Sequence, residues 1–84
     1  LTKLTFWKGL IEVIEAEGFF GLNKLNELDL SYNFIRKIDK HSFSGLNNLR
    51  LLDLSSNIIE NLEEDNFLDL VNLIKLDLKR NILK

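Results

Sequence analysis

Apolar and polar residues alternate along this chain in a pattern that returns every 24 residues. In three successive periods, four aliphatic residues and one asparagine stand at the same positions: Leu25, Leu28, Leu30, Asn33 and Ile35; Leu49, Leu52, Leu54, Asn57 and Ile59; Leu73, Leu76, Leu78, Asn81 and Leu83. A fixed period of about 20 to 50 residues is typical of stacked units, each of which buries its apolar face against a neighbour. The pattern predicts a repeat array with units at 1–24, 25–48 and 49–72 and a partial unit at 73–84.

A short strand is predicted near the start of each unit. Apolar residues stand at the fourth and sixth positions of the unit, with a polar residue between them: Leu4 and Phe6, Leu28 and Leu30, Leu52 and Leu54, Leu76 and Leu78. Alternation at period two indicates a half-buried strand. Four such strands would lie about 4.8 Å apart in a parallel sheet, with these residues on its inner face and the intervening residues on its outer face.

Two further columns of residues are predicted to hold the units together. The first consists of asparagines at the points where the strands end, and an amide can bond the backbone groups that a turn leaves unpaired: Asn33, Asn57 and Asn81. The second fills the core beside the aliphatic columns: Phe19, Phe43 and Phe67. In the first unit Gly9 replaces the asparagine, so a looser turn is expected there. Gly21 and Gly45 would end the segment opposite the sheet, and Asp69 replaces them in the third unit.

The pattern Leu25-x-x-Leu28-x-Leu30-x-x-Asn33-x-Ile35 resembles the consensus of the leucine-rich repeat family, and it covers the whole chain apart from Gly9. The 24-residue period resembles the subclass found in Toll and Toll-like receptor ectodomains, matrix proteoglycans and adhesion proteins. The resemblance implies an α/β repeat fold, a leucine-rich-repeat solenoid with a parallel β-sheet on its concave face. Its convex segments would be irregular or short helices.

The resemblance also implies partner binding and an extracellular or ectodomain location. Family members usually carry cysteine-rich caps, and this chain has no cysteine. It begins on an apolar repeat position and stops within a unit. We therefore expect a fragment of a longer solenoid without caps, which could associate through its uncapped ends.

The composition narrows the classes of function. Without cysteine, neither a disulfide framework nor a thiolate metal site can form. The net charge of −2, with acidic and basic residues interspersed, gives no electrostatic footprint for nucleic acid, and no apolar run is long enough for insertion into a membrane. His41 is the only histidine and falls on a polar stretch predicted to be solvated. The sequence therefore predicts no enzyme, no metal and no cofactor, and a protein ligand as partner.

The candidate contacts for such a ligand lie on the outer face of the predicted sheet. A column of aspartates follows the buried leucines, and it either belongs to the repeat consensus or forms an acidic strip: Asp29, Asp53 and Asp77. Trp7 and Tyr32 should project from adjacent strands, where exposed aromatics often serve as interface hot spots. Alternatively, Trp7 covers the end of the stack. Lys79 and Arg80 make the last strand basic.

The residue directly after the asparagine is apolar in every unit: Leu10, Phe34, Ile58 and Ile82. In the family this position is often polar and partly exposed. The stripe therefore packs beneath the next loop, which is the interpretation we favour from sequence, or forms an apolar contact surface. The exposure of Phe34 distinguishes the two.

Together these features favour a non-catalytic segment that recognises a protein ligand within a longer leucine-rich-repeat protein, such as a receptor or adhesion ectodomain. The alternative is a structural spacer or scaffolding array in an intracellular adaptor.

Overall fold

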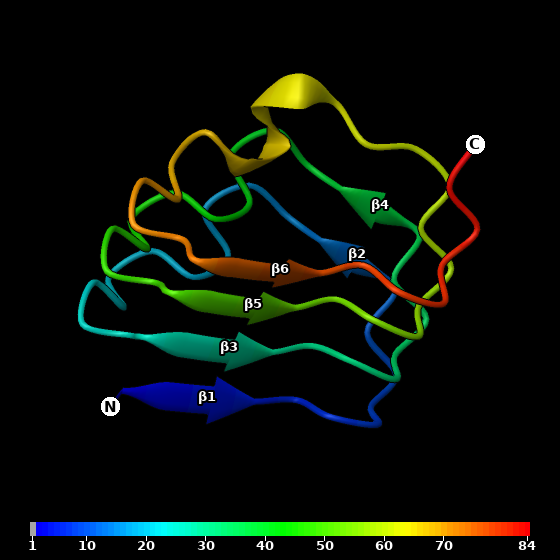
Figure 1. Cartoon of the computed structure of the whole chain (residues 1–84), viewed down its shortest axis with the longest axis horizontal. Coiled ribbons are helices and arrows are strands. Elements are labelled where there is room, and N and C mark those ends of the chain that lie inside the picture. Colours follow the sequence, from blue (N-terminus) through cyan, green and yellow to red (C-terminus); the bar gives the residue numbers. More distant parts are fainter. Residues whose placement is uncertain (1) are drawn as a thin grey trace.

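A computed structural model describes residues 2–84, without the side chain of Glu64. Leu1, the predicted first position of the first unit, lies outside the described residues. The main element is a four-stranded parallel sheet in the order β1-β3-β5-β6. Its strands are three residues long (Figure 1): β1 at Lys3–Thr5, β3 at Glu27–Asp29, β5 at Leu51–Asp53 and β6 at Lys75–Asp77. Paired residues on adjacent strands are 24 positions apart in the sequence, which is one unit. Leu4 pairs with Leu28, Leu28 with Leu52 and Leu52 with Leu76.

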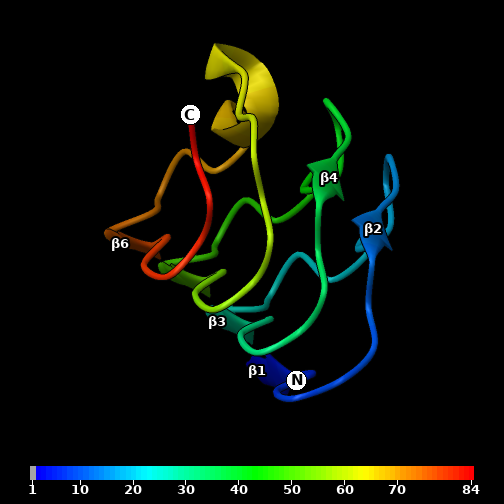
Figure 2. The same ribbon diagram turned by 90° about the vertical axis from the view of Figure 1, so that its right-hand side faces the viewer.

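The opposite side of the molecule carries shorter elements (Figure 2). β2 at Val13–Ile14 pairs in parallel with β4 at Lys37–Ile38. The third unit has instead a 3-10 helix, η1, at Glu64–Phe67. The predicted leucine-rich-repeat solenoid is confirmed, with its sheet on one face and almost no helix on the other.

The core lies between these two layers. Leu28, Leu52 and most of the other inner-face aliphatic residues of the second and third units have no exposed surface. Phe43 is buried and stacks between Phe19 and Phe67, at centroid distances of 6.1 and 5.9 Å. Burial weakens towards the outer units, where Phe6 is 41% exposed and Leu83 is 45% exposed, although both occupy predicted core columns. One neighbouring unit covers these residues instead of two.

Asparagines form a ladder after three of the four strands, β3, β5 and β6. Asn57 Nδ2 donates to the carbonyl oxygens of Leu30, Leu54 and Ser55, and its Oδ1 accepts from the N–H of Ile35. Asn33 and Asn81 make the corresponding bonds one unit earlier and one unit later. Each amide thus joins two successive turns and satisfies backbone groups that the fold takes out of water.

The turn at Gly9 keeps two features of the later turns. The residue before it, Lys8, has a φ of 58°, and the residues at the same position of later units lie within two degrees of it: Tyr32, Ser56 and Arg80. The N–H of Ile11 still bonds Asn33 Oδ1. A Cβ at Gly9 would lie only 2.7 Å from that oxygen, so Asn33 approaches the first turn more closely than an asparagine at position 9 would allow.

The segment opposite the sheet differs between units. Gly21 and Gly45 have φ near +90°, a conformation that glycine adopts without strain. Asp69 replaces them in the third unit and has no positive φ, because η1 and the αR residue Leu68 change the path of the chain there. Ser42 and Asn66 form a second polar ladder, since each donates from its side chain to the carbonyl of Ile14 or Ile38 in the preceding unit.

Candidate functional site

The turns that follow the four strands of the sheet carry most of the predicted contact residues. They lie at the arrowhead ends of the strands in Figure 1, and Figure 2 is viewed from that side. We call their exposed side chains the turn face: Trp7, Lys8, Leu10, Tyr32, Phe34, Ile58, Lys79, Arg80 and Ile82. This surface contains aromatic, aliphatic and basic residues and no carboxylate.

Backbone hydrogen bonds between units fix the turn face. The N–H groups of Lys8, Tyr32 and Ser56 donate to the carbonyl groups of Ser31, Ser55 and Lys79, respectively, one unit ahead. Those of Phe34, Ile58 and Ile82 donate to the carbonyl groups of Ile11, Ile35 and Ile59, one unit behind. The buried asparagine stands between these two sets of bonds. Because every turn is tied to its neighbours, the side chains project from a rigid backbone.

The apolar stripe does not pack beneath the next loop, so the interpretation favoured from sequence was wrong. Leu10 is 83% exposed, Phe34 51%, and Ile58 and Ile82 are also exposed, so none of them packs beneath the next loop. Asn33 and Ile35 are buried on either side of Phe34, and residues that alternate along an extended segment point to opposite sides. The sequence already contained this signal, because the repeat pattern predicts burial of the residues directly before and after each residue of the stripe.

Trp7 and Tyr32 lie in contact at one end of the turn face. Their ring centroids are 6.3 Å apart and the planes meet at 72°. Trp7 is 57% exposed and lies in the first unit, beside the edge strand β1. Lys8 Nζ lies 5.8 Å from the centre of the Trp7 ring, within the range of a cation–π contact.

Arg80 connects the two ends of the turn face. Its Nη1 donates to the Tyr32 hydroxyl at 3.3 Å, across the third unit, where Ser56 occupies the equivalent position. The hydroxyl oxygen of Ser56 is buried and has no hydrogen-bond partner among the described residues. The fold thus brings together Trp7, Tyr32 and Arg80, which are far apart in sequence.

The aspartate column has a structural role in at least two units. Asp29 Oδ1 accepts from the backbone N–H and the hydroxyl of Ser31, at 2.9 and 2.6 Å, and Asp53 does the same with Ser55. Asp77 accepts only from the N–H of Lys79. The carboxylates are partly exposed, but their first partners are the residues that begin the turns. The aspartates are the last residues of β3, β5 and β6, so they lie at the border of the turn face.

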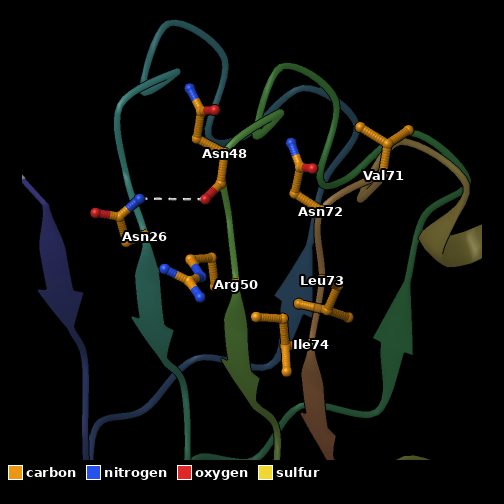
Figure 3. Close-up of a pocket in the computed structure, with 7 residues that line it drawn as sticks. All are labelled: Asn26, Asn48, Arg50, Val71, Asn72, Leu73 and Ile74. Carbon is orange, nitrogen blue, oxygen red and sulfur yellow. Dashed lines mark hydrogen bonds between the residues drawn. The ribbon is translucent and has the colours of Figure 1, made fainter.

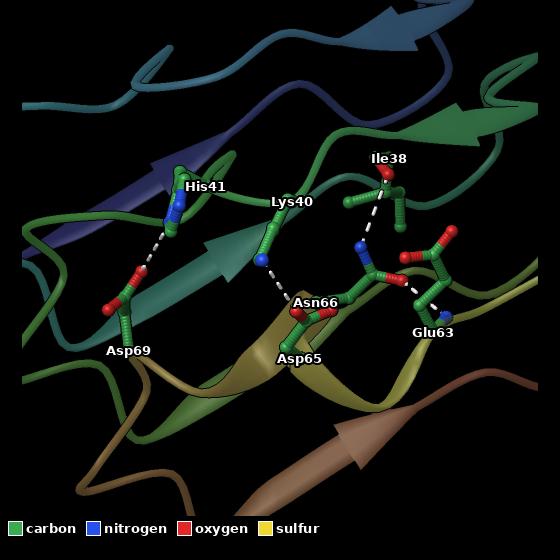
Figure 4. A network of polar contacts seen from close by, with 7 residues as sticks. All are labelled: Ile38, Lys40, His41, Glu63, Asp65, Asn66 and Asp69. Carbon is green, nitrogen blue, oxygen red and sulfur yellow. Dashed lines mark hydrogen bonds and ion pairs between the residues drawn. The ribbon is translucent and has the colours of Figure 1, made fainter.

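His41 lies on the opposite side of the molecule, within a set of polar contacts (Figure 4). Its Nδ1 is 3.8 Å from Asp69 Oδ2, and Lys40 Nζ is 3.1 Å from Asp65 Oδ2. Asn66 donates to Ile38 and accepts from the N–H of Glu63. These contacts tie the second unit to η1.

A shallow, open hollow of about 560 Å³ lies at the other end of the strands (Figure 3). It is lined by residues of the loops that lead into the sheet: Asn26, Asn48, Arg50, Val71, Asn72, Leu73 and Ile74. The amides of Asn26, Asn48 and Asn72 donate to backbone carbonyl groups, so they hold the loops together. This third ladder was not predicted. The other exposed side chains that line the hollow are those of Arg50, Val71 and Ile74.

Among the described residues, no group of three or more His, Cys, Asp or Glu side chains is arranged to hold a metal ion. Within residues 2–84 no helix is both long and apolar enough to cross a membrane.

A parallel sheet with one strand per 24-residue unit, joined by an asparagine ladder, defines a repeat solenoid. The sequence pattern of the Leucine rich repeat family matches residues 1–59, which shows that the chain belongs to this family. No curated protein matches the chain.

Among solved structures, the chain is similar to the crystal structure of a TLR13–ssRNA13 complex. The TM-score is 0.96 and the sequences are 35% identical. The match covers 99% of this chain and 12% of the TLR13 chain. The chain is therefore similar to a short stretch of TLR13.

Proposed function

We propose that this chain is a non-catalytic recognition segment of a leucine-rich-repeat protein and that its turn face contacts a macromolecular ligand. The observation that carries the proposal is the exposure of Trp7, Tyr32 and Phe34 on a backbone that is hydrogen-bonded between units. Large exposed aromatics are common hot spots of interfaces. A rigid surface also loses little conformational entropy on binding, which favours affinity.

The likeness to TLR13 supports a recognition role without fixing the class of ligand. The matched structure holds TLR13 together with ssRNA13. For the present chain, a protein ligand and the absence of nucleic-acid binding stay predictions from sequence. We further propose that the chain is part of a longer solenoid in an extracellular or luminal ectodomain. Resemblance to receptor repeats and the 12% coverage of TLR13 support this setting.

A spacer role is the second candidate, and one observation favours it. The side chains of Asp29 and Asp53, which could have met a ligand on the sheet, are bonded to Ser31 and Ser55. A spacer would need such internal bonds and no free surface. The spacer role does not explain the stripe beginning at Leu10, because a spacer has no need of apolar side chains that are 41–83% exposed at four successive turns.

The proposal is tested by replacing the three aromatic residues of the turn face together. We expect Trp7→Ala, Tyr32→Ala and Phe34→Ala to weaken ligand binding by the protein that carries this chain at least tenfold in Kd, because truncated hot spots typically cost more than about 1 kcal/mol each. Surface plasmon resonance would measure the affinity.

The matched control replaces three other exposed apolar residues, Phe20, Leu68 and Val71, by alanine. It should bind like the unmodified protein. Equal affinity of both variants would favour the spacer role. Circular dichroism of both must show the unmodified fold.

A further inference from the structure

We propose that the turn face accepts a short acidic segment of a partner protein, whose carboxylates meet Lys8, Lys79 and Arg80 and whose apolar side chains cover the stripe from Leu10 to Ile82. This inference rests on the proposed function and names the chemistry of the ligand. It is carried by charge, by the spacing of the turns and by the geometry of the two aromatic rings.

The cations of the turn face form no ion pair within the part of the molecule that the structure describes. Five other basic side chains lie within 4 Å of a carboxylate: Lys3 with Glu27, Arg36 with Glu12, Lys37 with Asp39, Lys40 with Asp65 and Lys84 with Glu60. Lys24, Arg50 and Lys75 also form no such pair among the described residues, and they lie at the start of the strands or in the loops that lead into them. Lys8, Lys79 and Arg80 have no such partner among the described carboxylates. Lys8 contacts the Trp7 ring and Arg80 the Tyr32 hydroxyl. The turn face therefore combines an exposed apolar stripe with three cations that have no described ion-pair partner, and the aspartate column lies along its border.

The dimensions of the turn face suit a short extended segment. Neighbouring turns follow the strand spacing of about 4.8 Å, so four turns extend over about 14 Å. An extended chain rises about 3.3 Å per residue, which places carboxylates for Lys8 and Arg80 about four residues apart. Each partner of a standard globular interface covers about 800 Å². A single row of four turns about 14 Å long suits a peptide-like segment better than a whole globular face.

The aromatic pair favours protein over single-stranded nucleic acid. Nucleobases are held by stacking on open aromatic faces. The rings of Trp7 and Tyr32 meet at 72°, so they cannot hold a planar base between them, and Lys8 already lies over the Trp7 ring. The apolar stripe consists of three aliphatic residues and Phe34, which match the side chains of a protein better than the polar edges of bases.

The bond between Arg80 and Tyr32 explains how the segment would be held. Both side chains are exposed and their contact is long at 3.3 Å. A carboxylate would attract Arg80 more strongly than the neutral phenol does, because it carries the opposite charge and can accept two parallel hydrogen bonds from the guanidinium group. The third turn, between Tyr32 and Arg80, carries the Ser56 hydroxyl, which is buried and has no partner among the described residues.

The test is selection of random 12-residue displayed peptides on the full 84-residue chain, with a random 13-nucleotide RNA pool assayed in parallel. We expect enriched peptides to carry net negative charge and at least two apolar residues. Their Kd should rise at least tenfold for Lys8→Glu, Lys79→Glu and Arg80→Glu together, and should rise with salt concentration.

The control variant is Lys24→Glu, Arg50→Glu and Lys75→Glu, which changes the net charge equally away from the turn face, at residues that form no ion pair with a described carboxylate either. It should keep the affinity of the unmodified chain. A neutral variant, Lys8→Met, Lys79→Met and Arg80→Met, replaces the charge reversal if that variant does not fold.

Three results would overturn the inference: no enrichment of acidic peptides, equal binding to both reversed variants, or binding of RNA in place of peptides. The aromatic triple variant separates this failure from failure of the proposed function. Ligand binding that is lost on replacing Trp7, Tyr32 and Phe34 but kept on charge reversal would leave the recognition role intact and remove only the acidic partner.

Discussion

Asn57 shows how one side chain can stabilise two turns. Its side chain is buried and hydrogen-bonds only to the backbone. Nδ2 donates to the carbonyl oxygens of Leu30, Leu54 and Ser55, and Oδ1 accepts from the N–H of Ile35. No aliphatic residue of similar size could make these bonds. Loss of the amide would leave carbonyl and N–H groups of two units buried without partners, and each such group costs about 1–3 kcal/mol.

We therefore expect Asn57→Ala to lower the free energy of unfolding by about 3 kcal/mol or more. Urea denaturation followed by circular dichroism would measure the change. Asn61, an exposed asparagine four residues later, provides the control, and Asn61→Ala should change stability by less than about 0.5 kcal/mol. Equal stability of the two variants would show that the ladder is dispensable.

At the scale of elements, the stacked phenylalanines join the three complete units on the side opposite the sheet. Phe43 is buried and its ring lies nearly parallel to that of Phe19, at 4°, and within 18° of that of Phe67. Stacked aromatic pairs contribute about 0.5–1.5 kcal/mol beyond the burial of their surface. The middle ring takes part in two such pairs.

Phe43→Leu should therefore destabilise the chain by about 1–2 kcal/mol, because leucine keeps an apolar side chain but loses both ring contacts. Thermal unfolding would show the change as a lower Tm. Phe20→Leu is the matched substitution at a phenylalanine that is 68% exposed, and its Tm should stay close to that of the unmodified chain. A similar loss for both would rule out a special role for the stack.

The strands, the asparagine ladder and the phenylalanine stack could be predicted from sequence because each repeats one chemistry at one position. The left-handed residues of the turns could not, because Lys8, Tyr32, Ser56 and Arg80 share no side-chain property and none is glycine or asparagine. Backbone bonds between units impose that conformation. The ladder of Ser42 and Asn66 was missed for a similar reason, since two different side chains perform the same function.

At the scale of the whole molecule, the stacking of units produces the candidate site. Trp7, Tyr32 and Arg80 stand in different units and meet only because the turns lie in register. The sequence placed these residues on the strands, at the outer face of the sheet, and this was wrong, because the strands end at Thr5, Asp29 and Asp77 and the residues lie in the turns that follow. The sequence also could not show that Arg80 reaches Tyr32 across a unit or that the apolar stripe is exposed. Those facts depend on side-chain directions set by the turn, and a repeat consensus contains no information about a ligand.

Trp7 gives the most direct measurement of the central claim, because it is the only tryptophan of the chain and lies on the turn face. Titration of the 84-residue chain with its ligand, followed by tryptophan emission, should give a saturable blue shift as Trp7 leaves water. Its midpoint should equal the Kd from an independent binding isotherm. Emission that stays unchanged at ligand concentrations that saturate binding would contradict recognition through the turn face.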